Sequence, residues 1–309
     1  MAIGKSAPLT MRFKGVAFVV LATVFWSSSG IFISFIMDGS DLSAVGLAFW
    51  RDLATFVVLL AGIGVIRPQR LRVKKNDLVW LAAMGASIGI FHILWNNAVV
   101  MIGASLSTVI QCNAPIFVTI MARFIFQEII TTRKLIAAAL AIAGTILVAG
   151  LGSGGEWKIV PIGLLIALAS AIMYGAFSLF GKKLSGDYNP WTILLYAFGF
   201  GTITLFLFQL GTPAPWPTSA AIVPWFVGLV LISTIAGFTS YTAGLQNLPA
   251  STASIAAMIE ILFASVMAYI FLGERLDFWQ IVGSVLIVGG VVLVSLDKNN
   301  RKNKEKHHA

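Results

Sequence analysis

The feature that most constrains this sequence is a series of apolar runs, each long enough to cross a membrane as a helix. About 20 mostly apolar residues are needed to span the roughly 30 Å hydrocarbon core of a bilayer. Only 11% of the residues are charged, against about 25% in an ordinary soluble domain. The sequence therefore predicts an all-α membrane protein of ten transmembrane helices. The predicted spans are 14–37, 42–66, 78–101, 103–126, 133–151, 160–181, 190–210, 222–245, 250–272 and 278–296.

The lysines and arginines predict how these helices are oriented, because cytoplasmic loops carry an excess of both residues. With the N-terminus inside, only Lys158 and Arg275 lie outside, and Arg51 and Arg123 lie within spans. The others, out of 21 in the chain, all fall on the inner side. Both termini are thus predicted to be cytoplasmic, with a basic tail that faces anionic lipid. Because these charges are dispersed over separate loops, we expect no nucleic-acid partner.

The two halves of the chain repeat each other. A shift of 146 residues places Ala104-Ser105 on Ala250-Ser251, Glu128 on Glu274 and Trp95 on Tyr241 without a gap. A shift of 148 places Trp26 on Tyr174. Each half has five predicted spans, and an odd number turns the second half upside down relative to the first. The register therefore predicts inverted repeats, 1–152 and 153–309, with Glu128 at the inner face and Glu274 at the outer face.

Residues 241–294 resemble the last three helices of the EamA-type repeat of the drug/metabolite transporter superfamily. Leu272-Gly273-Glu274 is typical of that repeat, and Phe126-Gln127-Glu128 is its weaker copy in the first half. Within the superfamily the chain is similar to the YddG-type exporters of aromatic amino acids. One departure is that many relatives carry Glu-Pro in the ninth helix, where this chain has Glu260-Ile261, with Ala114-Pro115 at the matching place in the fourth.

The resemblance implies ten helices in the bacterial inner membrane and a central cavity formed by the first four helices of each half. It further implies secondary transport that exports aromatic or other neutral amino acids and related small metabolites. Export of drugs or nucleobases by the same superfamily fold is the alternative. Alternating access through a midplane cavity is the expected mechanism. The sequence leaves open the substrate, the energy coupling and the oligomeric state, for which a monomer is one possibility.

Polar side chains within the spans predict a binding site, because a charge at the bilayer centre must face the bundle or water. Glu260 is either a hydrogen-bonded carboxyl that joins helices or the partner of a substrate ammonium or proton. His92, Trp95 and Asn96 share one helical turn, which favours cavity lining. We interpret the adjacent Arg51 and Asp52 as a structural ion pair.

Four aromatic residues, Trp26, Tyr174, Trp95 and Tyr241, form two repeat-related pairs deep in their spans. They would stack on a planar substrate or simply pack helices together. Gln111 lies one turn before Pro115, which is expected to kink its helix either to free a carbonyl for the cavity or for packing alone. The predicted substrate or cavity residues are Trp26, His92, Trp95, Asn96, Gln111, Tyr174, Tyr241 and Glu260.

Catalysis is poorly supported by the sequence, which contains no GxSxG, HExxH or Walker A motif and no histidine pair spaced for zinc. We therefore expect no enzymatic activity, no cofactor and no metal. An intramembrane enzyme that uses Glu260 and His92 as acid and base, and a passive channel, remain as minor alternatives. The expected partners are a small-molecule substrate and the lipid bilayer.

Overall fold

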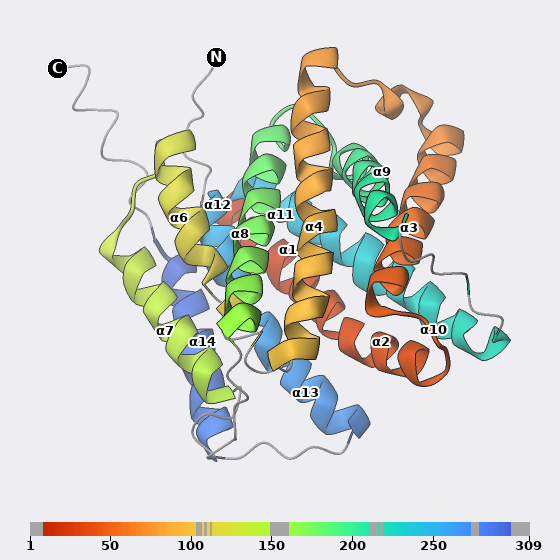
Figure 1. Cartoon of the computed structure of the whole chain (residues 1–309). Coiled ribbons are helices and arrows are strands. Elements are labelled where there is room, and N and C mark those ends of the chain that lie inside the picture. Colours follow the sequence, from red (N-terminus) through yellow and green to blue (C-terminus); the bar gives the residue numbers. More distant parts are fainter. Residues whose placement is uncertain are drawn as a thin grey trace.

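The structure is a computed structural model. It describes residues 9–102, 107, 110–111, 113–148, 161–210, 216, 219–272 and 278–297. Throughout these residues the regular secondary structure is helical, as predicted, and contains no strand. Seven helices within them are long and apolar enough to cross a membrane, and shorter apolar helices accompany them. The described part of the chain is thus a multi-pass helical bundle (Figure 1).

The helices follow the predicted spans in order. In the first half they are α1 (Leu9–Ser27), α2 (Ser29–Asp38), α3 (Ala44–Ile66), α4 (Leu78–Ile102), α6 (Ala114–Ile125) and α7 (Thr132–Val148), with short 3-10 turns η1 (Pro68–Leu71) and η2 (Lys75–Asp77) before α4. In the second half they are α8 (Pro161–Leu184), α9 (Pro190–Gln209), η4 (Ala220–Ile222), α10 (Val223–Gly228), η5 (Leu229–Ala236), α11 (Gly237–Asn247), α12 (Ala250–Ala257), α13 (Glu260–Leu272) and α14 (Phe278–Ser295).

Two spans predicted as single helices are interrupted at equivalent places. In the fourth span a turn at Asn113 precedes α6, whose first turn contains Pro115. Proline lacks the N–H that would continue a helix, which accounts for this break. The ninth span breaks between α12 and α13, where Met258 N–H and Ile259 N–H bond three residues back at 3.2 and 3.3 Å. In the 146-residue register the first residue of α6, Ala114, falls on the first residue of α13, Glu260.

The first predicted span, 14–37, is also divided, into α1 and α2 at Ser28. Two serine hydroxyls explain the interruption, because Ser27 Oγ donates to Val24 O at 2.7 Å and Ser28 Oγ donates to Phe25 O at 2.6 Å. Such side-chain bonds compete with the backbone ladder. The predicted span itself agrees with the structure, in which Thr10–Asp38 is long and apolar enough to cross a membrane, and Trp26 lies in the last turn of α1.

The eighth span contains a π-helix, η5, between α10 and α11. Thr234 Oγ1 donates to Leu229 O, five residues back, at 2.8 Å. Directly after the π-helix, Gly237 receives the indole of Trp26, since a β-carbon there would lie 2.7 Å from Trp26 Cδ1. The wider turns thus end where α11 meets α1.

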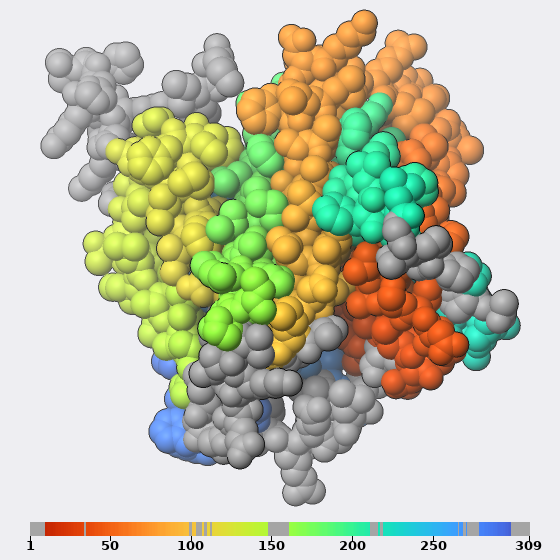
Figure 2. All heavy atoms as spheres, in the orientation of Figure 1, coloured from red at the N-terminus to blue at the C-terminus, as the bar shows by residue number. Residues whose placement is uncertain are grey.

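Helix packing joins the two halves of the chain. In Figure 1, α7 runs beside α14, and α4 lies between α8 and α9. In the space-filling view of Figure 2, α4 (orange) and α8 (green) are adjacent on one face. Large apolar side chains on the outside include Val65 (85% exposed) and Phe124 (70%). A surface this apolar is unfavourable in water, so its favourable surroundings are the hydrocarbon chains of lipid.

Candidate functional site

Three of the four predicted aromatic residues meet between α1, α8 and α11. The ring of Trp26 lies 6.4 Å from that of Tyr174 and 5.1 Å from that of Tyr241, centroid to centroid, and the two tyrosine rings lie 6.5 Å apart. Phe238, one turn before Tyr241, packs edge-on to Trp26 at 5.0 Å. One half of the chain thus contributes the indole and the other the phenols.

Phe91, which the sequence interpretation missed, connects this group to the remaining predicted residues on α4. Its ring is 5.7 Å from Tyr174, 6.2 Å from Trp95 and 5.3 Å from His92. The signal was present in the sequence, because Phe91 precedes Trp95 by four residues and so shares its face. Trp26, Phe91, Trp95, Tyr174 and Tyr241 form one connected set, which we call the aromatic cluster.

Two polar atoms lie within the aromatic cluster. The Tyr241 hydroxyl is fully buried and shares a hydrogen bond with Ser178 Oγ at 2.8 Å. Ser178, on α8, is the second residue that the sequence interpretation missed, after Phe91. Trp26 Nε1 is buried without a hydrogen-bond partner among the described residues. A buried N–H in this condition is unfavourable.

Arg51, Asp52 and His92 form a buried polar group between α3 and α4. Arg51 Nη2 contacts His92 Nε2, and Arg51 Nε lies 3.5 Å from Asp52 Oδ1. His92 Nδ1 lies 3.4 Å from Asp52 Oδ2, within ion-pair range but without the geometry of a hydrogen bond. The expected Arg51–Asp52 pair is present. The Asp52 side chain is 0% exposed and lies beside His92 as well as Arg51.

Asn96 and Gln111 tie neighbouring segments together. Asn96 Nδ2 donates to Ala44 O at 2.9 Å, which joins α4 to the start of α3. Gln111 Oε1 accepts from Ser170 Oγ at 3.0 Å, which joins the segment before α6 to α8, one turn from Tyr174. Both amides therefore have protein partners.

Glu260 is the first residue of α13, at the interruption of the ninth span. Its side chain is partly exposed, and its carboxylate makes no hydrogen bond or ion pair with any described residue. Its neighbours Ile259 and Ile261 pack in the same apolar core as Trp26 and Tyr241. Along the chain, Glu260 thus lies between two residues of that core. Ala114, directly before Pro115, occupies the equivalent half-helix start in the first half.

Metal binding has no support in the described segments, since no group of three or more His, Cys, Asp or Glu side chains there is arranged to hold an ion. Cys112 and Glu274 lie outside the described residues. The described residues thus bring five aromatic rings together, and Glu260 begins α13 at the interruption of the ninth span.

Comparison with known proteins identifies the family. The model of the EamA-like transporter family matches twice, over residues 13–150 and 161–296. The chain belongs to the EamA-like transporter family. This confirms the resemblance drawn from the repeated motif and makes the chain a membrane transporter. One matched segment falls within each of the halves predicted from internal repetition, 1–152 and 153–309.

Relatives of this EamA-like transporter align along almost their whole length. An uncharacterized transporter of Clostridium kluyveri is 24% identical over 95% of this chain and 96% of its own length. The uncharacterized inner membrane transporter YicL of Salmonella typhimurium is 25% identical over 93% and 97%. A probable terminal-alkyne amino-acid exporter of Streptantibioticus cattleyicolor is 26% identical over 91% and 93%. A solved crystal structure, 16% identical, shares the fold with a TM-score of 0.77 over 91% of this chain and 96% of its own.

Proposed function

We propose that this EamA-like transporter exports aromatic and other neutral amino acids across the bacterial inner membrane. The observation that carries the proposal is the aromatic cluster, in which both halves of the chain contribute rings to one buried surface. Planar side chains stack favourably on such rings. The similarity to a probable amino-acid exporter supports the substrate class, and the inner membrane name of YicL supports the location.

In this proposal Glu260 receives the substrate ammonium. Its carboxylate has no protein partner among the described residues, and a charge-assisted bond to an ammonium would satisfy it. The aromatic cluster holds the side chain of the substrate, and Trp26 Nε1 is free to donate to its carboxylate. Asn96, Gln111 and His92 would line the same space, and Pro115 would set the start of α6 toward it.

The proposed mechanism is alternating access between two inverted halves of five spans each, ten in all, with both termini cytoplasmic. The equivalent interruptions in the fourth and ninth spans support it, because discontinuous helices form the midplane sites of many inverted-repeat transporters. Helix breaks also provide places at which a half can bend. No step of this cycle forms or breaks a covalent bond.

Counterflow in proteoliposomes tests the proposal. Vesicles that contain the purified protein are loaded with phenylalanine, and uptake of labelled phenylalanine is measured against empty vesicles. We expect saturable exchange, and we expect Trp95→Ala and Glu260→Gln each to lower it about tenfold, since each removes one principal contact. Trp279→Ala, at a tryptophan of α14 that is 47% exposed, should leave exchange unchanged.

A panel of substrates separates the alternatives. Exchange of nucleobases or planar drugs without any amino acid would replace the proposed substrate class while keeping the transport function. Flux that does not saturate would indicate a channel. Chemical conversion of the loaded compound without flux would indicate an intramembrane enzyme. Equal loss of exchange in Trp279→Ala would show that the effect of Trp95→Ala is not specific to the site.

A further inference from the structure

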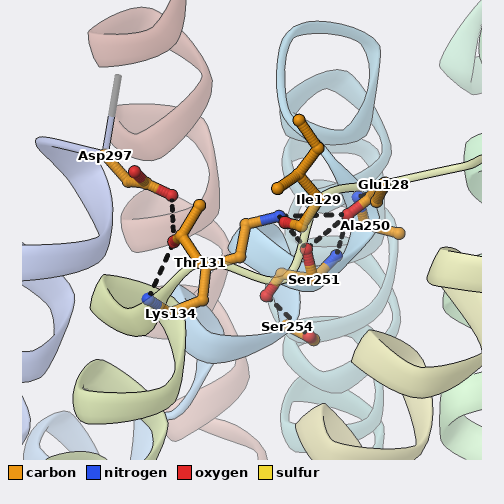
Figure 3. Close-up of polar contacts among 8 residues, drawn as sticks. All are labelled: Glu128, Ile129, Thr131, Lys134, Ala250, Ser251, Ser254 and Asp297. Atoms are coloured by element: carbon orange, nitrogen blue, oxygen red, sulfur yellow. Dashed lines mark hydrogen bonds and ion pairs between the residues drawn. The ribbon is translucent and has the colours of Figure 1, made fainter. Parts of the chain in front are cut away.

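A buried polar cluster at the predicted inner face connects the two halves (Figure 3). Glu128, just after α6, accepts hydrogen bonds at the first residues of α12: Ala250 N–H at 2.7 Å, Ser251 N–H at 3.4 Å and the Ser251 hydroxyl. A carboxylate at a helix N-terminus satisfies unpaired N–H groups and interacts favourably with the helix dipole. The end of the fourth span thus caps the start of the ninth.

The local backbone positions Glu128 for this contact. Gln127 has a left-handed backbone with φ 56°, and Glu128 N–H bonds back to Ala122 O at 3.2 Å, which closes α6. Glycine is the usual residue at such a position because it lacks a β-carbon. The 146-residue register places Gly273 of the Leu-Gly-Glu motif on Gln127. In the first half, the matching residues Phe126-Gln127-Glu128 therefore form the end of α6 followed by a carboxylate that caps α12.

Lys134 balances the charge of Glu128 inside the protein. Its Nζ donates to Ser251 Oγ at 2.7 Å and to Ile129 O at 3.0 Å, and lies 3.4 Å from Glu128 Oε2. The side chains of Lys134 and Glu128 are only 3% and 9% exposed. Loss of either partner would leave a buried charge without its counter-ion. The contact therefore forms or breaks as a unit.

The same cluster extends to the end of α14. Thr131 Oγ1 donates to Asp297 Oδ2 at 2.7 Å and accepts from Lys134 N–H at 3.2 Å. Segments from the fourth, fifth, ninth and tenth spans are thereby fastened at one face. The neighbouring residues of α6 and α12 pack tightly, with Val118, Ala122 and Ala250 fully buried or nearly so.

We propose that Glu128 is the latch of an inner gate. When the contact between Glu128, Lys134 and the N-terminus of α12 is closed, the path from the binding site to the cytoplasm is shut. Opening to the inside requires α6 and α12 to separate, and so requires this contact to break. This inference rests on the proposed alternating access, but it concerns the gate and not the substrate.

Cysteine accessibility tests the latch without any substrate. In a Cys112→Ser background, which removes the single native cysteine, Ser254→Cys places a probe on α12, at a side chain that is 2% exposed and bonds to Ser251 O. A membrane-impermeant maleimide is added to inverted membrane vesicles, and the labelling rate is measured. We expect Glu128→Gln to raise this rate about tenfold, because a lost charged contact shifts the gate toward open.

Two controls make the result specific. Glu274→Gln alters the repeat-equivalent residue at the predicted outer face and should not raise labelling of Ser254→Cys. Ala197→Cys, a fully buried probe on α9, should stay unlabelled in Glu128→Gln, since opening of a gate does not unfold the bundle.

An unchanged rate in Glu128→Gln would overturn the proposal, as would equal increases at both probes, which would indicate general loosening. Failure of amino-acid counterflow would leave the labelling result intact, and the two proposals can therefore fail separately.

Discussion

At the scale of single residues, the candidate site contains polar side chains that are unfavourable in contact with lipid. Their contact partners lie on other helices, so the sequence alone does not show which residues meet. The sequence identified His92 and the Arg51-Asp52 pair separately, because they belong to different spans. The structure joins them, with His92 Nδ1 3.4 Å from Asp52 Oδ2. Phe91 and Ser178 escaped notice because a phenylalanine or serine in an apolar run has nothing unusual about it. Buried polar residues thus reveal that a site exists, and packing decides which of them meet.

The buried charge of Asp52 leads to a stability prediction. Asp52→Asn removes the negative charge that faces Arg51 and His92, and a buried pair that loses one partner is destabilised by about 3 kcal/mol. We expect a clear fall in the thermal unfolding temperature in detergent. Asp41→Asn, at an exposed residue, should unfold like the unchanged protein. Full stability of Asp52→Asn with lost counterflow would instead give Asp52 a role in transport.

At the scale of helices, hydropathy located the spans but not their interruptions. Pro115 predicts the break before α6 from the sequence alone. The equivalent residue, Ile261, is compatible with a continuous helix and so does not predict the break after α12. That second break became foreseeable only through the repeat register. The π-helix η5 and the division at Ser28 also depend on local hydrogen bonds, which composition does not encode. Length and apolarity therefore predict elements, and specific side chains determine where each bends.

Adjacent glycines of α14 provide a matched test of helix packing. A β-carbon on Gly290 would lie 2.7 Å from Ala137 O of α7, whereas one on Gly289 would meet nothing within 4 Å. Gly290→Ala should push α7 away from α14 and lower the free energy of unfolding by about 1–3 kcal/mol, because a backbone carbonyl cannot move aside as a flexible side chain can. Gly289→Ala should be neutral or slightly stabilising. Thermal unfolding in detergent measures both, and equal behaviour of the two variants would contradict the packing.

At the scale of the whole molecule, segments that the charge pattern assigned to the inner face lie together. Tyr188, after α8, donates to Asp77 Oδ2 at 2.6 Å and accepts from Lys74 N–H at 3.1 Å. Partial burial raises the pKa of the Tyr188 hydroxyl, and the bond to Asp77 acts in the same direction. The hydroxyl consequently remains a donor at neutral pH. The loops before α4 and after α8, one from each half, therefore share one side of the bundle.

That shared side is predicted to be cytoplasmic, and labelling in intact cells decides it. In the Cys112→Ser background, Lys75→Cys and Asp41→Cys place exposed thiols at opposite ends of the neighbouring helices α3 and α4. An impermeant maleimide added outside should label Asp41→Cys and leave Lys75→Cys unmodified until the cells are permeabilised. The loop with Lys75 holds five lysines and arginines between 67 and 75, which the cell retains inside. The reverse pattern would invert the orientation, place the Glu128 contact at the outer face, and turn the proposed inner latch into an outer one.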